Sequence, residues 1–418
     1  MIKLTHNQIK ELHNKSRVYL DKLCVKIPKR QVGSQGNRDA TDFFAEVVSG
    51  FGFDVECPQF NCLDWIGESA SLSVGTDEFT IIPGPYSVGG VVNAPLVVVS
   101  SIEELEAAEI TGKVLLMIGE VAKEQLMPKN FPFYNPEEHQ LIYRFLESMQ
   151  PEAVIAATSK NWQLAAALYP FPLIEDGDFD IPSAYMKDVD GERLLEFAGQ
   201  IVSLNIRAER FPATGCNVIA RIGKLTDKRV VIMAHIDSRL DTPGALDNGT
   251  GVVVLLLLAE MLSDYDGDLG VELVAVNGED YYAASGEIAW VESNRSRFSE
   301  IVIGVNIDAA GYKVGKTAFS FYECPEAIIN LVRNVFAKHE GMVEGEPWYQ
   351  SDHSLFIQNG RPALAITSEQ FNVLSGEIAH TDKDTPNQVD YQKIVEVAVG
   401  LAEVVIDLDN SIESKIFI

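Results

Sequence analysis

The feature that most constrains the fold is a repeated pattern of apolar strand, loop and helix in the second half of the chain. Strands that alternate with helices form mostly parallel sheets, and the helices cover both faces of such a sheet. We therefore expect an α/β fold with a mixed, mostly parallel sheet flanked by helices. The apolar runs that predict its strands lie at residues 229–234, 270–276, 301–307 and 362–367, and a segment long enough for a helix follows each of them.

The first half of the chain has a different pattern of predicted helices and strands. Residues 6–25 and 36–53 predict two helices, but from about residue 62 to 204 short strand-like runs are separated by glycine, proline and acidic turns. A chain of 418 residues is long for one core, so two domains are the natural expectation. We expect a discontinuous domain of residues 1–61 plus 205–418, with a smaller β-rich domain inserted at 62–204.

Charge and hydropathy restrict the classes of partner. The chain has 33 basic and 61 acidic residues and a formal net charge of −28. Nucleic acids and anionic membranes need clustered lysine and arginine, so neither is expected as a partner. The N-terminus has no apolar signal core, and the longest aliphatic run, 251–262, is too short to span a bilayer. We expect a cytoplasmic protein; its oligomeric state is left open, a homodimer included.

The cysteines point to the same compartment. There are five, too scattered for a disulfide framework or a CxxC zinc site, and an odd count suits a reducing environment. We expect buried thiols, with a bridge between Cys57 and Cys62 as the alternative.

Candidate ligands follow each of the four expected strands. A single aspartate at a strand end is most often a turn former, but open α/β sheets bind ligands at the carboxyl ends of their strands. Imidazole and carboxylate without thiolate form the ligand set of zinc, manganese or a similar divalent ion. The residues concerned are His235, Asp237, Glu279, Asp280, Asp308 and, in the loop after the fourth strand, His380.

A further acid, Asp247, lies in the glycine-rich segment 234–251, just before an aliphatic helix. This segment lacks the lysine of a phosphate-binding loop, and the chain has no GxSxG elbow, HExxH helix or GxxxxGK loop. Asp241 in the same segment is interpreted as a turn residue. The acidic run 175–180 lacks the spacing of an EF-hand and is interpreted as a surface turn.

In order and spacing, these motifs resemble the M28 family of zinc exopeptidases. The resemblance covers about 205–418, extends to 30–53, and implies a zinc-exopeptidase sheet of the phosphorylase/hydrolase-like kind. It also makes residues 62–204 similar to a protease-associated (PA) insertion domain. The matching motifs are HxD at 235–237, GALDNGTG around Asp247, the pair Glu279 and Asp280, NIDAAG around Asp308, SDHSLF at 351–356 and HTDKDT from His380.

The resemblance implies a centre of two divalent ions, zinc in the family. Asp247 would bridge the ions, His235 and Asp308 would complete one site, and Asp280 and His380 would complete the other. Such ions together acidify a bridging water and polarise the scissile carbonyl.

The resemblance also gives roles to residues that bind no metal. Glu279 would be the general base that takes the proton of the water and later gives it to the leaving amine. Asp237 would accept a hydrogen bond from His235 and fix its tautomer. Asp352 and His353 match a loop near the substrate cleft, where a substrate contact and a structural hydrogen bond are equally open.

Two further points follow from the resemblance. The peptide bond after Asp247 is expected to be cis. Asp280 stands where the relatives usually carry glutamate; because aspartate is one methylene shorter, the second ion is expected to lie differently or bind more weakly.

The function expected from these residues is that of an aminopeptidase that releases N-terminal residues from peptide substrates. Three alternatives stay open, because the motifs define amide cleavage and not which terminus is held. They are a carboxypeptidase or dipeptidase of the same family, a glutaminyl-cyclase-like transferase with a single zinc, and a non-catalytic peptide-binding relative.

Overall fold

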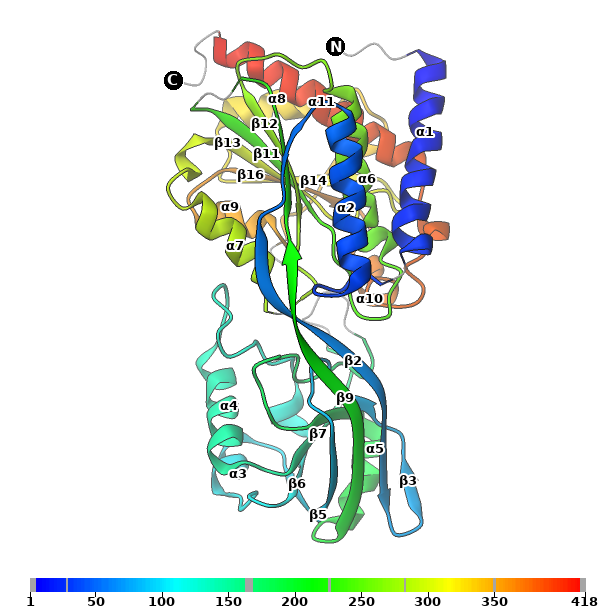
Figure 1. Ribbon diagram of the computed structural model, residues 1–418, viewed down its shortest axis with the longest axis vertical. Helices are drawn as coiled ribbons and strands as arrows, with labels where there is room; N and C mark the ends of the chain where they lie inside the picture. The colour runs from blue at the N-terminus through cyan, green and yellow to red at the C-terminus, as the bar shows by residue number, and fades with distance from the viewer. Residues whose placement is uncertain are drawn as a thin grey trace. The chain divides into compact units, whose positions relative to one another are not determined.

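The computed structural model describes residues 5–27, 29–161, 168–224, 227–281, 283–348 and 351–413. It divides into two compact units, Met1–Asn61 with Thr214–Ile418 (unit 1) and Cys62–Ala213 (unit 2) (Figure 1). The second division lies later than the expected 204/205, near the end of strand β9 (Ile201–Cys216).

Unit 1 is built on a sheet that has eight strands within the described residues, in the order β1-β10-β12-β11-β13-β16-β14-β15. The four strands β12, β11, β13 and β16 are neighbours and run parallel, whereas β1, β10 and β14 pair antiparallel with their neighbours toward the centre. The strands are β1 (Asp54–Glu56), β10 (Val218–Ile222), β11 (Arg229–His235), β12 (Gly270–Val276), β13 (Ile301–Ile307), β14 (Thr317–Tyr322), β15 (Met342–Glu344) and β16 (Ala363–Ser368).

The central strands form where the sequence predicts them. Every residue of β11, β12 and β16 is buried, as expected for parallel strands with helices on both faces. The mostly parallel α/β sheet is thereby confirmed. Strands β14 and β15 were not predicted. In β14 the alternation of apolar and polar residues is too short to indicate a strand, and β15 has only three residues.

Helices cover both faces of this sheet. α2, α6, α1 and α11 lie on one side, and α7 and α9 lie on the other (Figure 1). α6 is buried all round from Thr250 to Ala259, which explains why its sequence is apolar without a polar face. The helices of unit 1 are α1 (His6–Asp21), α2 (Gln35–Gly50), α6 (Thr250–Met261), α7 (Ser285–Asn294), α8 (Glu326–Phe336), α9 (His353–Gln358), α10 (Phe371–Glu377) and α11 (Tyr391–Glu413).

Side-chain caps define where the first two helices begin. Thr5 and Gln8 form a reciprocal capping box at α1, and the Ser34 hydroxyl accepts the Asn37 N–H at α2. The α-helical part of α1 is shorter than the expected 6–25, because the last turn, Lys22–Lys26, widens into a π-helix.

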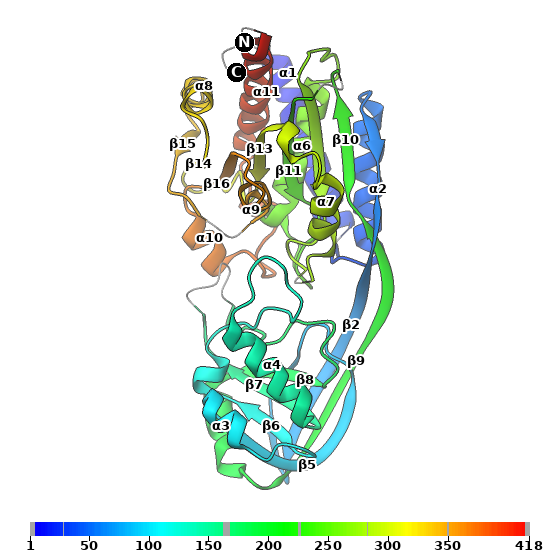
Figure 2. The same ribbon diagram turned by 90° about the vertical axis from the view of Figure 1, so that its left-hand side faces the viewer.

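Unit 2 is β-rich, with the strand order β3-β2-β9-β5-β6-β7-β8-β4 and two apolar cores. Alternate residues of β6 enter opposite cores, so each face of the sheet buries its own cluster. Helices α3 and α4 pack on one face (Figure 2), and the interpretation as a PA-type domain stays a prediction. The elements are β2 (Gln59–Val74), β3 (Asp77–Phe79), β4 (Ile82–Pro83), β5 (Gly90–Val99), β6 (Val114–Met117), β7 (Ala153–Thr158), β8 (Ser183–Lys187), α3 (Ile102–Ala107), α4 (Glu137–Met149) and α5 (Asp188–Leu194).

Two smaller expectations need correction. The start of the acidic run 175–180 is buried and not a surface turn, because the Asp176 carboxylate accepts the N–H groups of Lys129 and Asp178. The five cysteines, all in described residues, form no disulfide bond, but only Cys24 and Cys62 are buried, whereas Cys216 and Cys324 are half-buried and Cys57 is exposed. In the part of the chain that the structure describes, no helix is both long and apolar enough to cross a membrane.

Candidate metal centre

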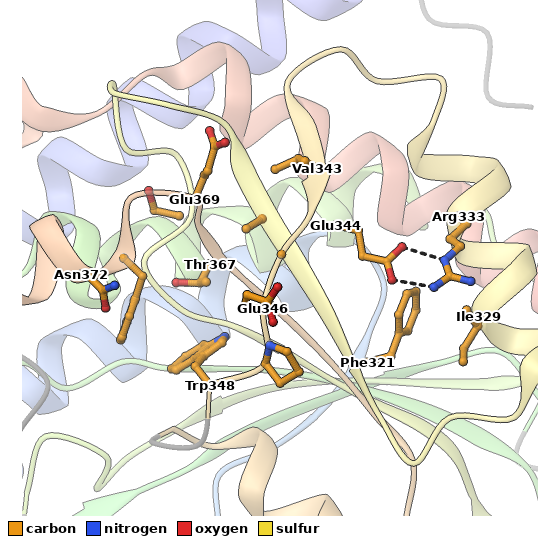
Figure 3. Close-up of a pocket in the computed structure, with 15 residues that line it drawn as sticks. Phe321, Ile329, Arg333, Val343, Glu344, Glu346, Trp348, Thr367, Glu369 and Asn372 are labelled. Carbon is orange, nitrogen blue, oxygen red and sulfur yellow. Dashed lines mark hydrogen bonds and ion pairs between the residues drawn. The ribbon is translucent and has the colours of Figure 1, made fainter. Parts of the chain in front are cut away.

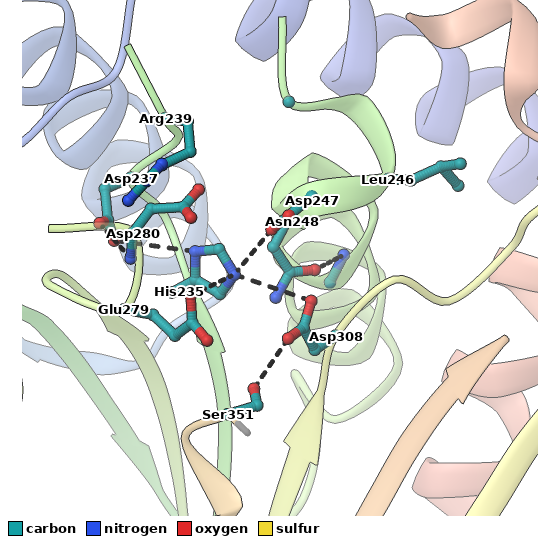
Figure 4. A network of polar contacts seen from close by, with 12 residues as sticks. His235, Asp237, Arg239, Leu246, Asp247, Asn248, Glu279, Asp280, Asp308 and Ser351 are labelled. Atoms are coloured by element: carbon teal, nitrogen blue, oxygen red, sulfur yellow. Dashed lines mark hydrogen bonds and ion pairs between the residues drawn. The ribbon is translucent and has the colours of Figure 1, made fainter. Parts of the chain in front are cut away.

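Four parallel strands bring their carboxyl ends to one edge of the unit 1 sheet. His235 ends β11, Asp308 follows β13, and Glu279 and Asp280 follow β12 (Figure 4). In the sheet, β11 lies between β12 and β13. The chain continues from β11 to its neighbour β12 and then crosses to β13 on the opposite side of β11, so the strand order reverses at β11. Such a reversal leaves a crevice at the carboxyl ends of the strands, where α/β proteins bind ligands.

Two loops add the remaining candidate ligands. Asp247 lies in the short segment Ala245–Gly249 just before α6, and its peptide bond to Asn248 is cis, as expected. The Asn248 side chain donates to the Ile307 carbonyl and accepts the Gly251 N–H, which attaches this loop to the end of β13. His380 follows α10 and has a positive φ of 58°.

The two carboxylate oxygens of Asp247 face different histidines. Oδ1 lies 3.2 Å from His235 Nε2, and Oδ2 lies 3.0 Å from His380 Nε2. Asp308 Oδ1 lies 3.7 Å from the His235 nitrogen, and Asp280 Oδ1 lies 2.9 Å from the His380 nitrogen. The contacts thus form two groups of donors that share Asp247.

The donors are suited to a divalent cation. Both ring nitrogens of His235 and Oδ2 of Asp280 are buried without a hydrogen-bond partner among the described residues, and buried polar atoms of this kind are normally satisfied. Ligand atoms of His235, Asp247 and Asp280 all lie within 4.8 Å of one another. Clustered carboxylates repel one another when buried, and a bound cation would remove that repulsion.

The electrostatics of the centre reflect this crowding. Burial, opposed by His235 and reinforced by Asp280 and Asp308, raises the pKa of Glu279 well above its usual range. Burial lowers the pKa of His380, but the carboxylates of Asp280 and Asp247 outweigh it and raise that pKa to about 9. Glu279 Oε2 lies 4.0 Å from His235 Nε2, at the more exposed side of the cluster.

Asp237 does not make the hydrogen bond predicted for it. Its Oδ1 lies 3.8 Å from His235 Nδ1, beyond hydrogen-bond distance. The reason is that both of its oxygens accept backbone N–H groups, from Gly278 at 3.0 Å and from Asp280 at 3.1 Å. In the structure Asp237 therefore positions the loop that carries Glu279 and Asp280.

Asp352 and His353 are both fully buried. His353 Nε2 lies 2.7 Å from the Trp348 carbonyl oxygen, and burial lowers the pKa of this histidine to about 4. These contacts favour the structural interpretation for His353. Their neighbour Ser351 reaches the centre: its hydroxyl donates to Asp308 Oδ2 at 2.8 Å.

Two residues that the sequence did not single out hold the Asp247 loop. Asp384 accepts the N–H groups of Leu246 at 2.7 Å and Asp247 at 3.0 Å. Arg30, 1% exposed, donates to the carbonyls of Ile236, Pro243 and Gly244, among others. Asp384 lies in the HTDKDT motif and Arg30 at the start of the segment 30–53. In neither segment does the periodicity or spacing of residues reveal a contact with a residue more than 130 positions away.

Asp384→Ala is expected to lower the free energy of unfolding by roughly 2–4 kcal/mol, because it leaves two buried N–H groups without an acceptor. It should also weaken metal retention, since the loop carrying Asp247 is released. Urea unfolding and chelator competition measure the two effects. The exposed Asp382→Ala is the matched control, and equal behaviour of the two variants would show that Asp384 does not hold the loop.

Comparison with known proteins points to one family. Residues 217–405 match Peptidase family M28, and all the candidate ligands lie within this range. Over this segment the chain is similar to peptidase family M28. Its M28 segment includes β10 to β16 and most of α11, so the family region and the parallel sheet coincide.

Proteins similar to this chain match both units. A probable leucine aminopeptidase 2 of Aspergillus fumigatus is 23% identical over 381 residues, covering 83% of this chain and 71% of the relative. The fold is shared with an aminopeptidase from Aneurinibacillus sp. strain AM-1 (TM-score 0.72, 20% identity, 95% and 93% of the two chains). It is shared too with BSAP, a zinc aminopeptidase from Bacillus subtilis (TM-score 0.71, 18% identity, 95% and 94%).

Proposed function

We propose that this protein is a cytoplasmic aminopeptidase that holds two divalent ions, zinc by the chemistry of its donors. The observation that carries the proposal is the position of Asp247, whose two oxygens lie 3.2 and 3.0 Å from two different histidines. A carboxylate placed in this way can bridge two ions. Asp308 stands beside the first histidine and Asp280 beside the second, which gives each ion its own further ligand.

The donor set explains the preference for zinc. Two imidazoles and three carboxylates without thiolate match zinc sites of the catalytic kind, which keep positions open for water and substrate. When bound, the ions supply Lewis-acid polarisation of the scissile carbonyl and an acidified water. The related aminopeptidases and the zinc aminopeptidase named above support the same assignment.

Glu279 carries the proton transfers in this proposal. Adjacent residues at the end of a strand point to opposite sides, so Asp280 can bind an ion while Glu279 faces the water. Glu279 takes the proton of the attacking water and gives it to the leaving amine. Asp237 supports this step because it fixes the backbone on both sides of Glu279, at Gly278 and Asp280.

The terminus that the enzyme recognises is tested with blocked dipeptides. We expect cleavage of a dipeptide amide with a free α-amine and no cleavage of its N-acetylated form. Cleavage of an N-acetylated dipeptide with a free carboxylate, and not of the dipeptide amide, would make the protein a carboxypeptidase, and cleavage only of dipeptides with both ends free would make it a dipeptidase. Cyclisation of N-terminal glutamine with one ion per chain would instead favour the transferase.

A further inference from the structure

Unit 1 contains a pocket of about 920 Å³ whose lining includes none of the candidate metal ligands (Figure 3). It is lined by parts of β14 and β15, the end of β16, and residues of α8 and α10. Aromatic rings from Phe321, Trp348 and Phe371 form part of its walls, and the last two pack with their centroids 4.9 Å apart.

Two walls of the pocket are attached to Asp308. Thr367 lines the pocket, and the residue before it, Ile366, accepts the Asp308 N–H through its carbonyl at 2.9 Å. On the other wall, Trp348 lies three positions before Ser351, whose hydroxyl donates to the Asp308 carboxylate at 2.8 Å. The pairing of β13 with β16 thus holds one wall of the pocket, at Thr367, beside Asp308.

Buried polar atoms line the pocket without partners. Thr367 is only 5% exposed, and neither its hydroxyl nor the buried indole N–H of Trp348 has a hydrogen-bond partner among the described residues. A buried donor or acceptor left unpaired costs free energy. Their placement indicates that the pocket receives a ligand with polar groups.

The charge of the lining is negative. It includes three carboxylates, of Glu344, Glu346 and Glu369, and one cation, Arg333. Arg333 is already bound to Glu344 by hydrogen bonds of 2.7 and 2.6 Å. Within the described residues no cationic side chain is paired with Glu346 or Glu369, although Glu369 accepts the backbone N–H of Lys316. Two carboxylates are thus available to a ligand.

Resting on the proposed aminopeptidase function, we propose that this pocket binds the basic side chain, lysine or arginine, of the substrate residue whose peptide bond is cleaved. The aromatic rings of Trp348 and Phe371 pack against the aliphatic stem of such a side chain. Glu346 and Glu369 bind its cationic group. The volume suffices for an extended arginine or lysine side chain.

The preference is measured as kcat/KM of the metal-loaded full chain on the p-nitroanilides of lysine, arginine, leucine and glutamate. We expect lysine and arginine to exceed leucine by about tenfold, and glutamate to be the poorest. Glu346→Gln and Glu369→Gln should each reduce the ratio of lysine to leucine several-fold, mainly through KM. Glu346→Lys should raise the relative rate on glutamate, and the exposed Glu377→Gln, outside the lining, is the matched control.

Binding of L-argininamide and L-leucinamide, measured by calorimetry, tests the pocket without catalysis. Tighter binding of argininamide that Glu346→Gln weakens supports the pocket, even if no substrate is cleaved and the aminopeptidase proposal fails. Equal binding of the two amides, unchanged in Glu346→Gln and Glu369→Gln, would overturn the pocket proposal while N-terminal cleavage could still stand.

Discussion

Replacement of Glu279 by glutamine is expected to lower kcat by about 10³-fold or more with the metal content unchanged. Glutamine has nearly the same size but cannot take a proton from the attacking water. Glu279 contributes no oxygen to the contacts between Asp247 and the two histidines, so those contacts should persist. Steady-state kinetics on leucine p-nitroanilide, together with elemental analysis of the same preparation, measure both quantities.

Glu279→Asp is the informative companion to this variant. It retains a carboxylate, displaced by one methylene, and should therefore be more active than the glutamine variant. A glutamine variant near the wild-type rate would remove Glu279 from the mechanism. Loss of metal from that variant would make it a ligand and not the base.

Asp247→Ala is expected to abolish both metal binding and peptidase activity. Among the described residues, Asp247 is the only residue whose carboxylate contacts both histidines. One of its oxygens lies near His235 and the other near His380. Without them each remaining group keeps one histidine and one carboxylate, too few to hold an ion against dilution. Elemental analysis after gel filtration should fall from two ions per chain to none.

Loss of metal because the bridging ligand is absent must be distinguished from loss of metal because the variant misfolds. Asp247 contacts both His235 and His380, so its loss is expected to lower the midpoint of urea unfolding of the metal-free protein modestly, while a single cooperative transition would show that the variant still folds. Asp241→Ala is the control, because Asp241 is, as expected, an exposed turn residue of the same loop, paired with Lys29. Retention of two ions by Asp247→Ala would contradict the bridging role.

The sequence predicted the part of the fold that apolar runs determine. β11, β12, β13 and β16 are long and buried, so hydrophobic pattern and final structure agree, although β13 is followed by β14 before the helix α8. β14 could not be found in this way, because its existence depends on antiparallel pairing with β16, a contact between residues 41 to 51 positions apart. The short helices α9 and α10 likewise depend on packing and carry little periodicity.

The residues of the candidate site also differ in how far the sequence could predict them. His235, Asp308 and His380 could be proposed because they end or follow buried strands, whereas the bridging role of Asp247, in the loop before α6, depended on family resemblance. Asp237 was assigned the wrong partner, since the competing N–H groups of Gly278 and Asp280 are visible only in three dimensions. The pocket beside Asp308 was missed, because β14, β15 and α10 were not predicted.

Elemental analysis of the purified chain, paired with hydrolysis of leucine and lysine p-nitroanilides before and after chelation, shows whether two ions are held around Asp247. We expect two ions per chain, loss of p-nitroaniline release on chelation, and its recovery when zinc is restored. No bound divalent ion after addition of zinc or cobalt, or activity that survives complete removal of metal, would contradict the two-ion centre.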